Sequence, residues 1–261
     1  MKIIGLIGGG QMGEAILKGL PANFRAVVCE LNSARQTYLR RRYHVQTGEL
    51  PLVIEQSSVL ILAVKPQDME ETLAAIAFLL TKKILVISIA AGKTTRYIES
   101  HLGPYARVVR VMPNLPALVG ASMTAVCRGK SAQIKDVQTA CQIFNRIGQT
   151  LIVEERLMNA VTAVSGSGPG YIFYFVECLT QAALKLGLSQ IQSEQLVLQT
   201  LRGSALLLEK TGEATSQLRA KVTSKGGTTQ AAMDVFMARH IEKIFIEALT
   251  AARNRARELA K

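Results

Sequence analysis

Few side chains in this sequence are suited to binding metals or forming disulfides. The four cysteines lie far apart, with no C-x-x-C pair, and this spacing suits reduced thiols rather than a zinc site or a disulfide framework. The three histidines are equally scattered, and none has the spacing of a metal ligand. We therefore expect no bound metal and a reaction that needs no histidine base.

Long apolar runs are also missing. Val59–Val64 is typical of the apolar segments, and none approaches the roughly 20 residues that a membrane-spanning helix needs. The first apolar segment breaks at once into Gly8–Gly10 and Glu14, so we do not expect a signal peptide. The sequence favours a cytoplasmic protein without a membrane partner.

The net charge of +12 raises the question of nucleic-acid binding. The basic residues are spread along the chain and lack the interleaved aromatic residues of a single-strand groove. We interpret the charge as solvated helix faces with some attraction for anionic substrates and cofactors, and expect no nucleic-acid partner.

The first residues predict a strand, a tight turn and a helix, with Gly8, Gly10 and Gly13 spaced as G-x-G-x-x-G. In this motif Gly8 permits the turn, and Gly10 lets the backbone approach a pyrophosphate. Gly13 lets the helix pack on the strand, so that its free N–H groups face the phosphates. The pattern predicts a dinucleotide site.

The residues after the second predicted strand give conflicting signals on the coenzyme. Glu30 stands twenty residues after Gly10, where a carboxylate can accept hydrogen bonds from the adenosine ribose hydroxyls and would repel a 2′-phosphate. Arg35 and Arg40–Arg42 follow closely and could neutralise such a phosphate. The sequence leaves both NADPH and NADH open.

Strands and helices alternate up to about residue 153, which predicts a doubly wound α/β sheet. The expected later strands are 59–64, 84–89, 107–112, 122–127 and 150–153. From residue 154 onward, the strand signals stop and five helices are expected. The predicted domains are 1–153, a Rossmann-type dinucleotide-binding domain, and 154–261, an all-helical domain for dimerisation and substrate binding.

Several of these helices are apolar around most of their circumference, for example over Tyr171–Val176 and Ala205–Leu208. Such helices need burial on more than one side, so we expect a dimer. Two glycine-rich segments, Ser165–Gly170 and Thr223–Thr229, each precede a predicted helix and can present its N–H groups to an anion such as a carboxylate. The second adds three hydroxyl groups, which is more than a helix cap needs.

The sequence resembles the pyrroline-5-carboxylate reductases over nearly its full length. Six motifs carry this resemblance, in this order: Gly8–Gly13, Ala63–Pro66, Ala90–Gly92, Val111–Asn114, Ser165–Pro169 and Val222–Thr229. The resemblance implies reduction of 1-pyrroline-5-carboxylate, a cyclic imine carboxylate, to L-proline with NADPH or NADH, the final step of proline biosynthesis. It also implies a homodimer that is often assembled further.

By position, the resemblance also assigns site residues. The coenzyme contacts would be Ile7, Gly8, Gly9, Gly10, Gln11, Met12, Asn32, Ala63, Val64, Lys65, Pro66, Ile89, Ala90 and Ala91, to which the glycine motif and its spacing add Gly13 and Glu30. The substrate contacts would be Glu155, Ser224, Gly226, Gly227, Thr228 and Thr229. Thr229 would be catalytic, with its hydroxyl near the imine nitrogen to orient it or relay a proton.

Three residues depart from the usual family motifs: Lys225 replaces a proline, Gly170 an alanine and Leu115 a threonine. Two alternatives remain open. A β-hydroxyacid dehydrogenase would place a lysine base four residues after Gly168, where this chain has Ile172. A regulator that senses NAD(P) would bind the coenzyme without consuming it, and the intact hydroxyl cluster around Thr228 speaks against that role.

Overall fold

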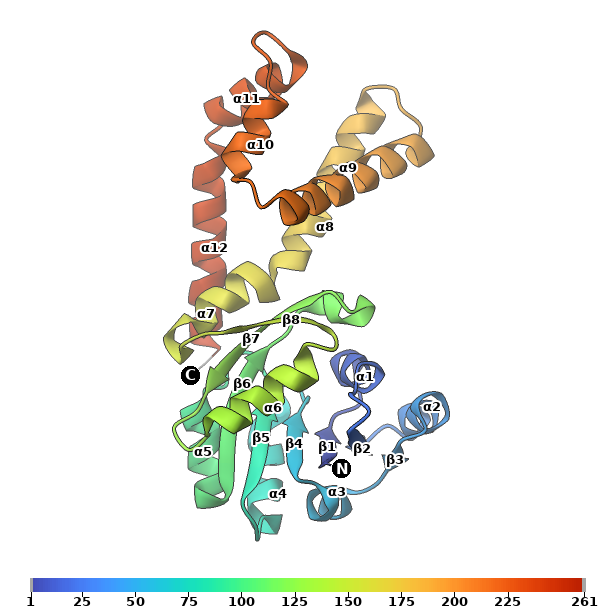
Figure 1. Ribbon diagram of the computed structural model, residues 1–261, viewed down its shortest axis with the longest axis vertical. Coiled ribbons are helices and arrows are strands. Elements are labelled where there is room, and N and C mark those ends of the chain that lie inside the picture. The colour runs from blue at the N-terminus through green and yellow to red at the C-terminus, as the bar shows by residue number, and fades with distance from the viewer. Residues whose placement is uncertain (1, 260–261) are drawn as a thin grey trace. The chain divides into compact units, whose positions relative to one another are not determined.

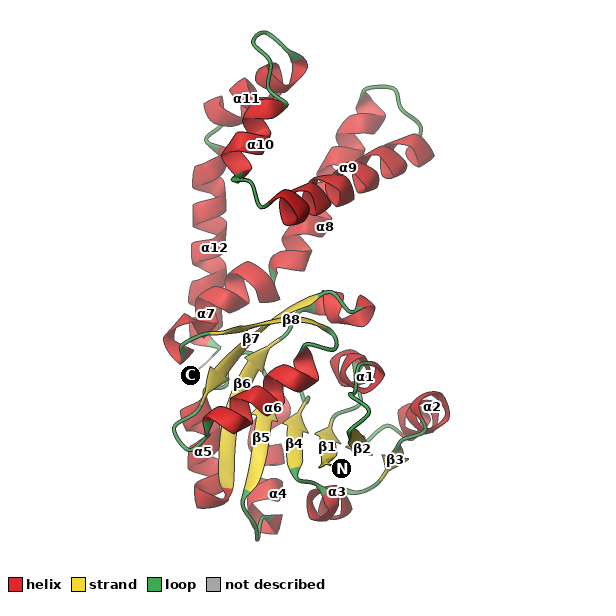
Figure 2. Cartoon of the chain, in the orientation of Figure 1, coloured by secondary structure: helices red, strands yellow, loops and turns green. Residues whose placement is uncertain are grey.

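The computed structural model describes residues 2–259 of the protein (Figure 1). An eight-stranded sheet has helices on both faces, and the later part of the chain is helical (Figure 2). The strands are β1 (Lys2–Ile7), β2 (Phe24–Cys29), β3 (Gln46–Thr47), β4 (Val59–Leu62), β5 (Ile84–Ser88), β6 (Ala106–Met112), β7 (Ser122–Arg128) and β8 (Gly148–Ile152). The helices of this part are α1 (Gln11–Lys18), α2 (Ser33–Tyr43), α3 (Leu50–Gln56), α4 (Met69–Leu79), α5 (Thr95–Leu102) and α6 (Ile134–Phe144).

The order of strands in the sheet is β3-β2-β1-β4-β5-β6-β7-β8. From β1 the chain builds outward through β2 and β3, then returns to add β4 on the other side of β1. Ile7 pairs with Leu62 at the carboxyl ends of β1 and β4, where this order reverses. Open α/β sheets bind ligands at such a point.

The buried core lies on both faces of the sheet because β4, a central strand, is apolar at every position. Leu60 and Leu62 of β4 face a cluster formed with α3, α4 and α5, and Ile61 faces a second cluster formed with α1 and α6. All three side chains are fully buried, and burial of each contributes about 1.5–3 kcal/mol. The predicted Rossmann-type fold is confirmed.

Two features of the sheet differ from the predicted alternation of parallel strands and helices. β7 runs antiparallel to β6, and β8 pairs parallel with β7. The nine residues 113–121 that connect β6 to β7 are too few for the crossover that a parallel strand needs, which takes about a dozen residues or more. β3 has only two residues, and so short a strand has no periodicity by which the sequence could predict it.

Residues 2–169 and 251–259 form one compact unit, and residues 170–250 form a second. The later helices are α7 (Met158–Val161), α8 (Gly168–Lys185), α9 (Gln190–Thr211), α10 (Thr215–Lys221), α11 (Thr228–Ala238) and α12 (Ile241–Glu258). The helical nature predicted for this region is confirmed, as is Gly212, which ends α9 in the left-handed conformation. Within residues 2–259, the helices are too short or too polar to cross a membrane. The boundary at residues 153 and 154 remains a prediction.

Candidate functional site

The turn between β1 and α1 depends on glycine at two positions. Gly8 has φ of +100°, and a Cβ there would lie 2.6 Å from the carbonyl oxygen of Ala63. A Cβ on Gly13 would lie 2.4 Å from the carbonyl oxygen of Gly8, so glycine lets α1 pack against the turn. Gly10 differs, since a Cβ there would meet no atom within 4 Å. The backbone at Gly10 is therefore open to a ligand, and the turn fits a dinucleotide pyrophosphate.

Glu30 holds this turn from the neighbouring strand. One carboxylate oxygen accepts a hydrogen bond from the Gly9 N–H at 2.8 Å, and the other accepts one from the Asn32 N–H, also at 2.8 Å. The Asn32 side chain in turn caps α2 by accepting a hydrogen bond from the Arg35 N–H at 2.9 Å. Two of the predicted coenzyme residues, Glu30 and Asn32, are thus joined to the glycine turn and to the start of α2.

Arg35 and Glu14 form a second support of the glycine turn, which no sequence motif predicts. The Arg35 guanidinium donates from Nε to the Gly9 carbonyl oxygen at 2.7 Å and pairs with the Glu14 carboxylate. Glu14 also accepts hydrogen bonds from the Tyr38 and Tyr43 hydroxyls, at 2.8 and 2.7 Å. Burial raises the pKa of Glu14, but the hydrogen bonds from Tyr43, Tyr38 and Arg35 outweigh it and hold the pKa below its ordinary value. A charged Glu14 therefore keeps Arg35 on the turn.

The other predicted coenzyme segments follow the adjacent strands. Ala63–Pro66 begins where β4 ends, and the Ala63 N–H donates to the Ile7 carbonyl oxygen at 2.8 Å. Ile89–Ala91 follows β5, and the Ile89 N–H donates to the Leu62 carbonyl oxygen at 3.1 Å. The structure thus brings these segments and the glycine turn together at one edge of the sheet. Their roles as coenzyme contacts stay predictions.

Glu155 lies against the start of α5. Its carboxylate oxygens accept hydrogen bonds from the Thr95 N–H at 2.7 Å and the Thr95 hydroxyl at 2.5 Å, and one oxygen lies 3.5 Å from Arg110 Nη1. The Arg110 side chain is 3% exposed, and burial lowers its pKa while the Glu155 charge opposes that effect. Both oxygens of Glu155 thus position the helix that follows Ala90–Gly92. The predicted substrate contact of Glu155 stays untested.

The first glycine-rich segment differs from its expected conformation. The sequence predicts an open turn before a helix, but residues Thr162–Gly166 form a π-helical stretch that joins α7 to α8 almost without a break. The glycine at Gly166 serves packing, because a Cβ there would lie 2.5 Å from Met112 Cε. Asn114 fixes the stretch by donating a hydrogen bond to the Ser165 carbonyl oxygen at 3.1 Å. A contact of this kind between distant residues leaves no periodic signal in the sequence.

The second glycine-rich segment is a turn before α11, within the second unit. Gly226 has φ of +71°, and a Cβ on Gly227 would lie 2.3 Å from Ser224 Oγ, so both glycines are needed for this shape. Gly227 is the N-cap of α11 and offers no side chain to cap it. The first-turn N–H groups of Thr228 and Thr229 have no intrahelical partner, and the N-cap residue supplies no side-chain acceptor for them. The predicted substrate residues Ser224 and Gly226–Thr229 share this one turn, which suits an anion.

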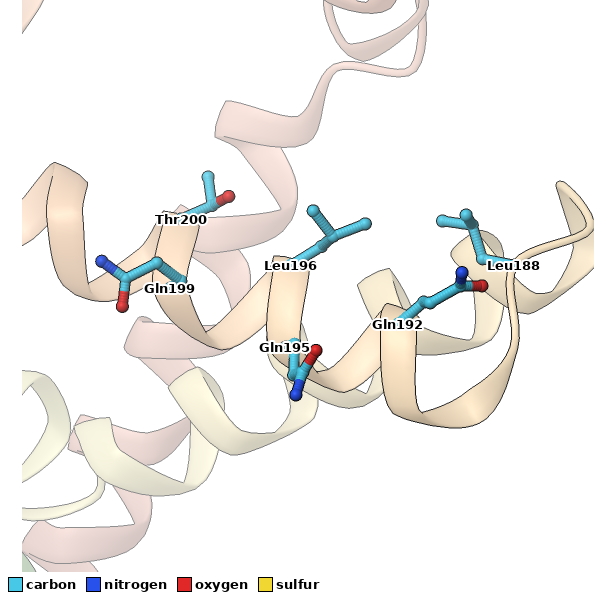
Figure 3. Close-up of a pocket in the computed structure, with 6 residues that line it drawn as sticks. All are labelled: Leu188, Gln192, Gln195, Leu196, Gln199 and Thr200. Atoms are coloured by element: carbon cyan, nitrogen blue, oxygen red, sulfur yellow. The ribbon is translucent and has the colours of Figure 1, made fainter.

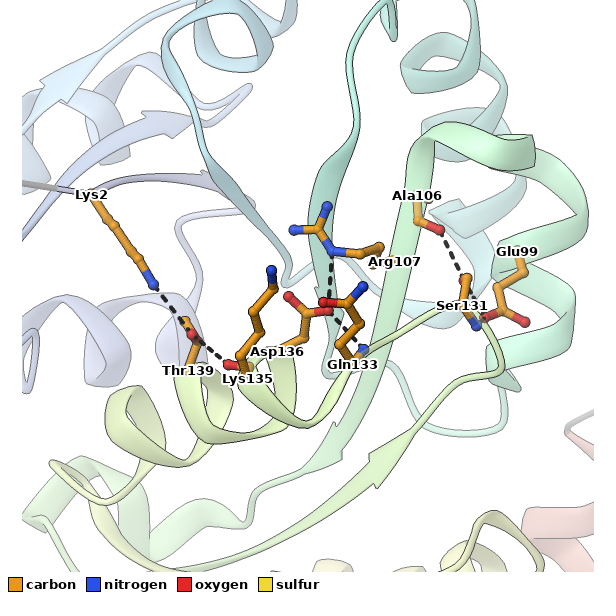
Figure 4. A network of polar contacts seen from close by, with 9 residues as sticks. All are labelled: Lys2, Glu99, Ala106, Arg107, Ser131, Gln133, Lys135, Asp136 and Thr139. Atoms are coloured by element: carbon orange, nitrogen blue, oxygen red, sulfur yellow. Dashed lines mark hydrogen bonds and ion pairs between the residues drawn. The ribbon is translucent and has the colours of Figure 1, made fainter.

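Two other regions contain none of these residues. An open hollow of about 440 Å³ runs along α9 (Figure 3) and is lined by Leu188, Gln192, Gln195, Leu196, Gln199 and Thr200. It holds none of the predicted site residues and no ionisable group, so it suggests no chemistry. At the edge of the sheet where β1 starts, Arg107 and Asp136 pair at 3.0 Å and Lys2 donates to Thr139 at 3.3 Å (Figure 4). These contacts anchor α6 to the sheet.

The fold and the glycine turn define a dinucleotide-dependent oxidoreductase. The family model described as NADP oxidoreductase coenzyme F420-dependent matches residues 3–92, and the model described as pyrroline-5-carboxylate reductase dimerisation matches residues 155–259. The chain is 40% identical to the pyrroline-5-carboxylate reductase of Synechocystis, covering 99% of this chain and 98% of the relative. The chain belongs to the pyrroline-5-carboxylate reductase family.

Solved structures agree with this assignment. A pyrroline-5-carboxylate reductase from Coxiella burnetii is 37% identical and superposes with a TM-score of 0.92, covering 100% of this chain and 99% of that one. The Plasmodium falciparum pyrroline carboxylate reductase with NADP bound is 28% identical, with a TM-score of 0.88 and coverage of 100% and 98%. The predicted reductase family is confirmed, and the β-hydroxyacid dehydrogenase and the coenzyme-sensing regulator are not favoured.

Proposed function

We propose that the chain reduces 1-pyrroline-5-carboxylate to L-proline with NADH or NADPH. The observation that carries this proposal is the match of the whole chain to pyrroline-5-carboxylate reductases, with both glycine turns intact. A small biosynthetic substrate and a diffusible coenzyme also agree with the cytoplasmic location that the sequence predicts.

The proposed chemistry needs position and electrostatics from the protein. The bound dihydronicotinamide supplies the hydride, and a cyclic imine is basic enough to be protonated to the iminium that accepts it. The uncapped N–H groups of α11 would hold the substrate carboxylate, with help from the Ser224 and Thr228 hydroxyls. The Thr229 hydroxyl would orient the ring nitrogen or relay its proton. These roles require no metal ligand and no covalent nucleophile.

The direct test is coenzyme consumption. Purified protein mixed with pyrroline-5-carboxylate and NADH or NADPH is expected to oxidise the coenzyme, with L-proline formed in equal amount. The measurement is the loss of reduced-coenzyme absorbance together with chromatographic detection of proline. Coenzyme binding without consumption would contradict the reductase and favour the sensing regulator. Oxidation of a 3-hydroxy acid with the oxidised coenzyme, in place of reduction of the imine, would favour the β-hydroxyacid dehydrogenase.

We also propose that residues 154–261 form the homodimer. Large apolar side chains are exposed along the second unit, including Tyr174 at 67%, Leu198 at 63% and Ile246 at 59%. Surfaces of this kind on a soluble protein mark sites of association. In sedimentation at micromolar concentration the protein is expected to be a dimer or a multiple of one. Because apolar contacts resist salt, the same species should persist in 1 M NaCl, at roughly 3 Å Debye length. A monomer, or dissociation by salt, would contradict the proposal.

A further inference from the structure

The contacts of Glu30 and of the nearby arginines bear on whether the chain uses NADH or NADPH. Family membership does not decide it, since the Plasmodium relative has NADP bound. Resting on the proposed function, we propose that this chain selects NADH over NADPH, and that the Glu30 carboxylate is the residue that excludes the 2′-phosphate.

The position of Glu30 is fixed by contacts at both oxygens. The residue directly follows β2, and its carboxylate lies 2.8 Å from the Gly9 N–H of the glycine turn. In a dinucleotide bound on such a turn, the adenosine ribose lies beside the acidic residue that ends the second strand. A carboxylate can accept a hydrogen bond from a ribose hydroxyl, whereas a 2′-phosphate there would face a like charge. Because both oxygens are held by backbone N–H groups, the charge cannot swing away without breaking those bonds.

Arg35 is the arginine best placed to offset the Glu30 charge, but it already donates hydrogen bonds to the glycine turn. Arg35 donates from Nε to the Gly9 carbonyl oxygen at 2.7 Å and from Nη2 to the Gly10 carbonyl oxygen at 3.3 Å. Its charge is balanced by Glu14, which Tyr38 and Tyr43 hold in the charged form. Using Arg35 for a 2′-phosphate would therefore mean taking it from the glycine turn.

The remaining arginines, Arg40–Arg42, lie too far along α2 to neutralise a 2′-phosphate beside Glu30. Arg40–Arg42 occupy the last turn of that helix, whereas Glu30 and Asn32 stand at its start. With a rise of about 1.5 Å per residue, Arg40 lies about 10 Å along the helix axis from Ser33. The donors at the helix start are also partly used, because the Asn32 N–H serves Glu30 and the Arg35 N–H serves Asn32. The N–H groups of Ser33 and Ala34 remain there, so the barrier to a phosphate is the Glu30 charge rather than a lack of donors.

The test compares both coenzymes in the full-length protein. We expect kcat/KM with pyrroline-5-carboxylate to be at least about tenfold higher for NADH than for NADPH. Glu30→Gln keeps the shape and one acceptor oxygen but removes the charge, so the ratio should fall about tenfold, mainly through a lower KM for NADPH. The matched control is Glu55→Gln, an exposed glutamate at the end of α3 and thus just before β4 begins, which should leave the ratio unchanged.

Calorimetric binding of NADH, NADPH and 2′,5′-ADP separates this inference from the proposed function. Tighter binding of NADH with no consumption of either coenzyme would contradict the reductase activity but support the preference for NADH. Turnover with NADPH equal to or better than NADH would overturn the inference and leave the reductase standing. An unchanged ratio in Glu30→Gln would remove the role of Glu30. If that variant fails to fold, as judged by its melting curve, the wild-type ratio alone decides coenzyme selection.

Discussion

Replacement of Thr229 by alanine is expected to lower kcat about 100- to 10,000-fold, the usual contribution of a well-placed proton-transfer group. Thr229 lies in the first turn of α11, next to the N–H groups that would hold the substrate carboxylate. Loss of its hydroxyl leaves that anchor in place, so the KM for pyrroline-5-carboxylate should change much less than kcat. The measurement is steady-state kinetics at saturating coenzyme.

Two further variants make the Thr229 result specific. Thr229→Ser retains a hydroxyl and should recover most of the lost turnover. Thr215→Ala removes an exposed threonine from the first turn of α10 and should behave as wild type. Unchanged turnover in Thr229→Ala would defeat the catalytic role, and equal loss in Thr229→Ala and Thr229→Ser would point to packing instead.

Gly8→Ala is expected to cause the second large effect, a loss of both thermal stability and coenzyme binding. The new Cβ would lie 2.6 Å from the Ala63 carbonyl oxygen on a backbone with φ of +100°, so the turn must move. Strain of this kind costs about 1–3 kcal/mol, and a shift of the turn by about 1 Å can cost about 100-fold in activity. We expect a lower melting temperature together with loss of coenzyme binding by calorimetry.

Gly10→Ala is the matched comparison. Gly10 has φ of −66° and open space around its Cβ position, so the substitution should leave the melting temperature unchanged. A methyl group would stand where the pyrophosphate approaches, and coenzyme affinity should still fall. Wild-type coenzyme binding in Gly10→Ala would show that the dinucleotide does not lie on this turn. Wild-type stability in Gly8→Ala would contradict the packing described for Ala63.

The sequence predicts the parts of this fold that follow a repeating pattern. The all-apolar run at Val59–Val64 predicts a strand covered on both faces, and the structure has β4 within it. The spacing of Gly8, Gly10 and Gly13 predicts the coenzyme turn. The family motifs place the Ser224–Thr229 turn before α11, where the structure has it. In each case, a local pattern of residue types determines the local conformation.

What the sequence does not predict depends on contacts between distant residues. The Arg35–Glu14 pair spans 21 positions, and the Glu155–Thr95 contact spans 60, so neither appears in a local pattern. The π-helical stretch contacts distant residues, with Asn114 bonded to Ser165 and Met112 close to Gly166, and the direction of β7 is set by the length of the connection before it. Such features require the coordinates.

Substitution of Gly227, the residue before α11, would affect both the thermal stability of the protein and its turnover. A serine or aspartate at Gly227 could cap the helix, and such a cap stabilises a helix by a few tenths of a kcal/mol more than glycine does. That gain would use an N–H group which, under the proposed assignment, must stay vacant for the substrate carboxylate, and a Cβ would also strike Ser224 Oγ. Selection for a more durable enzyme should therefore spare this residue, because an improvement there would compete with the reaction itself.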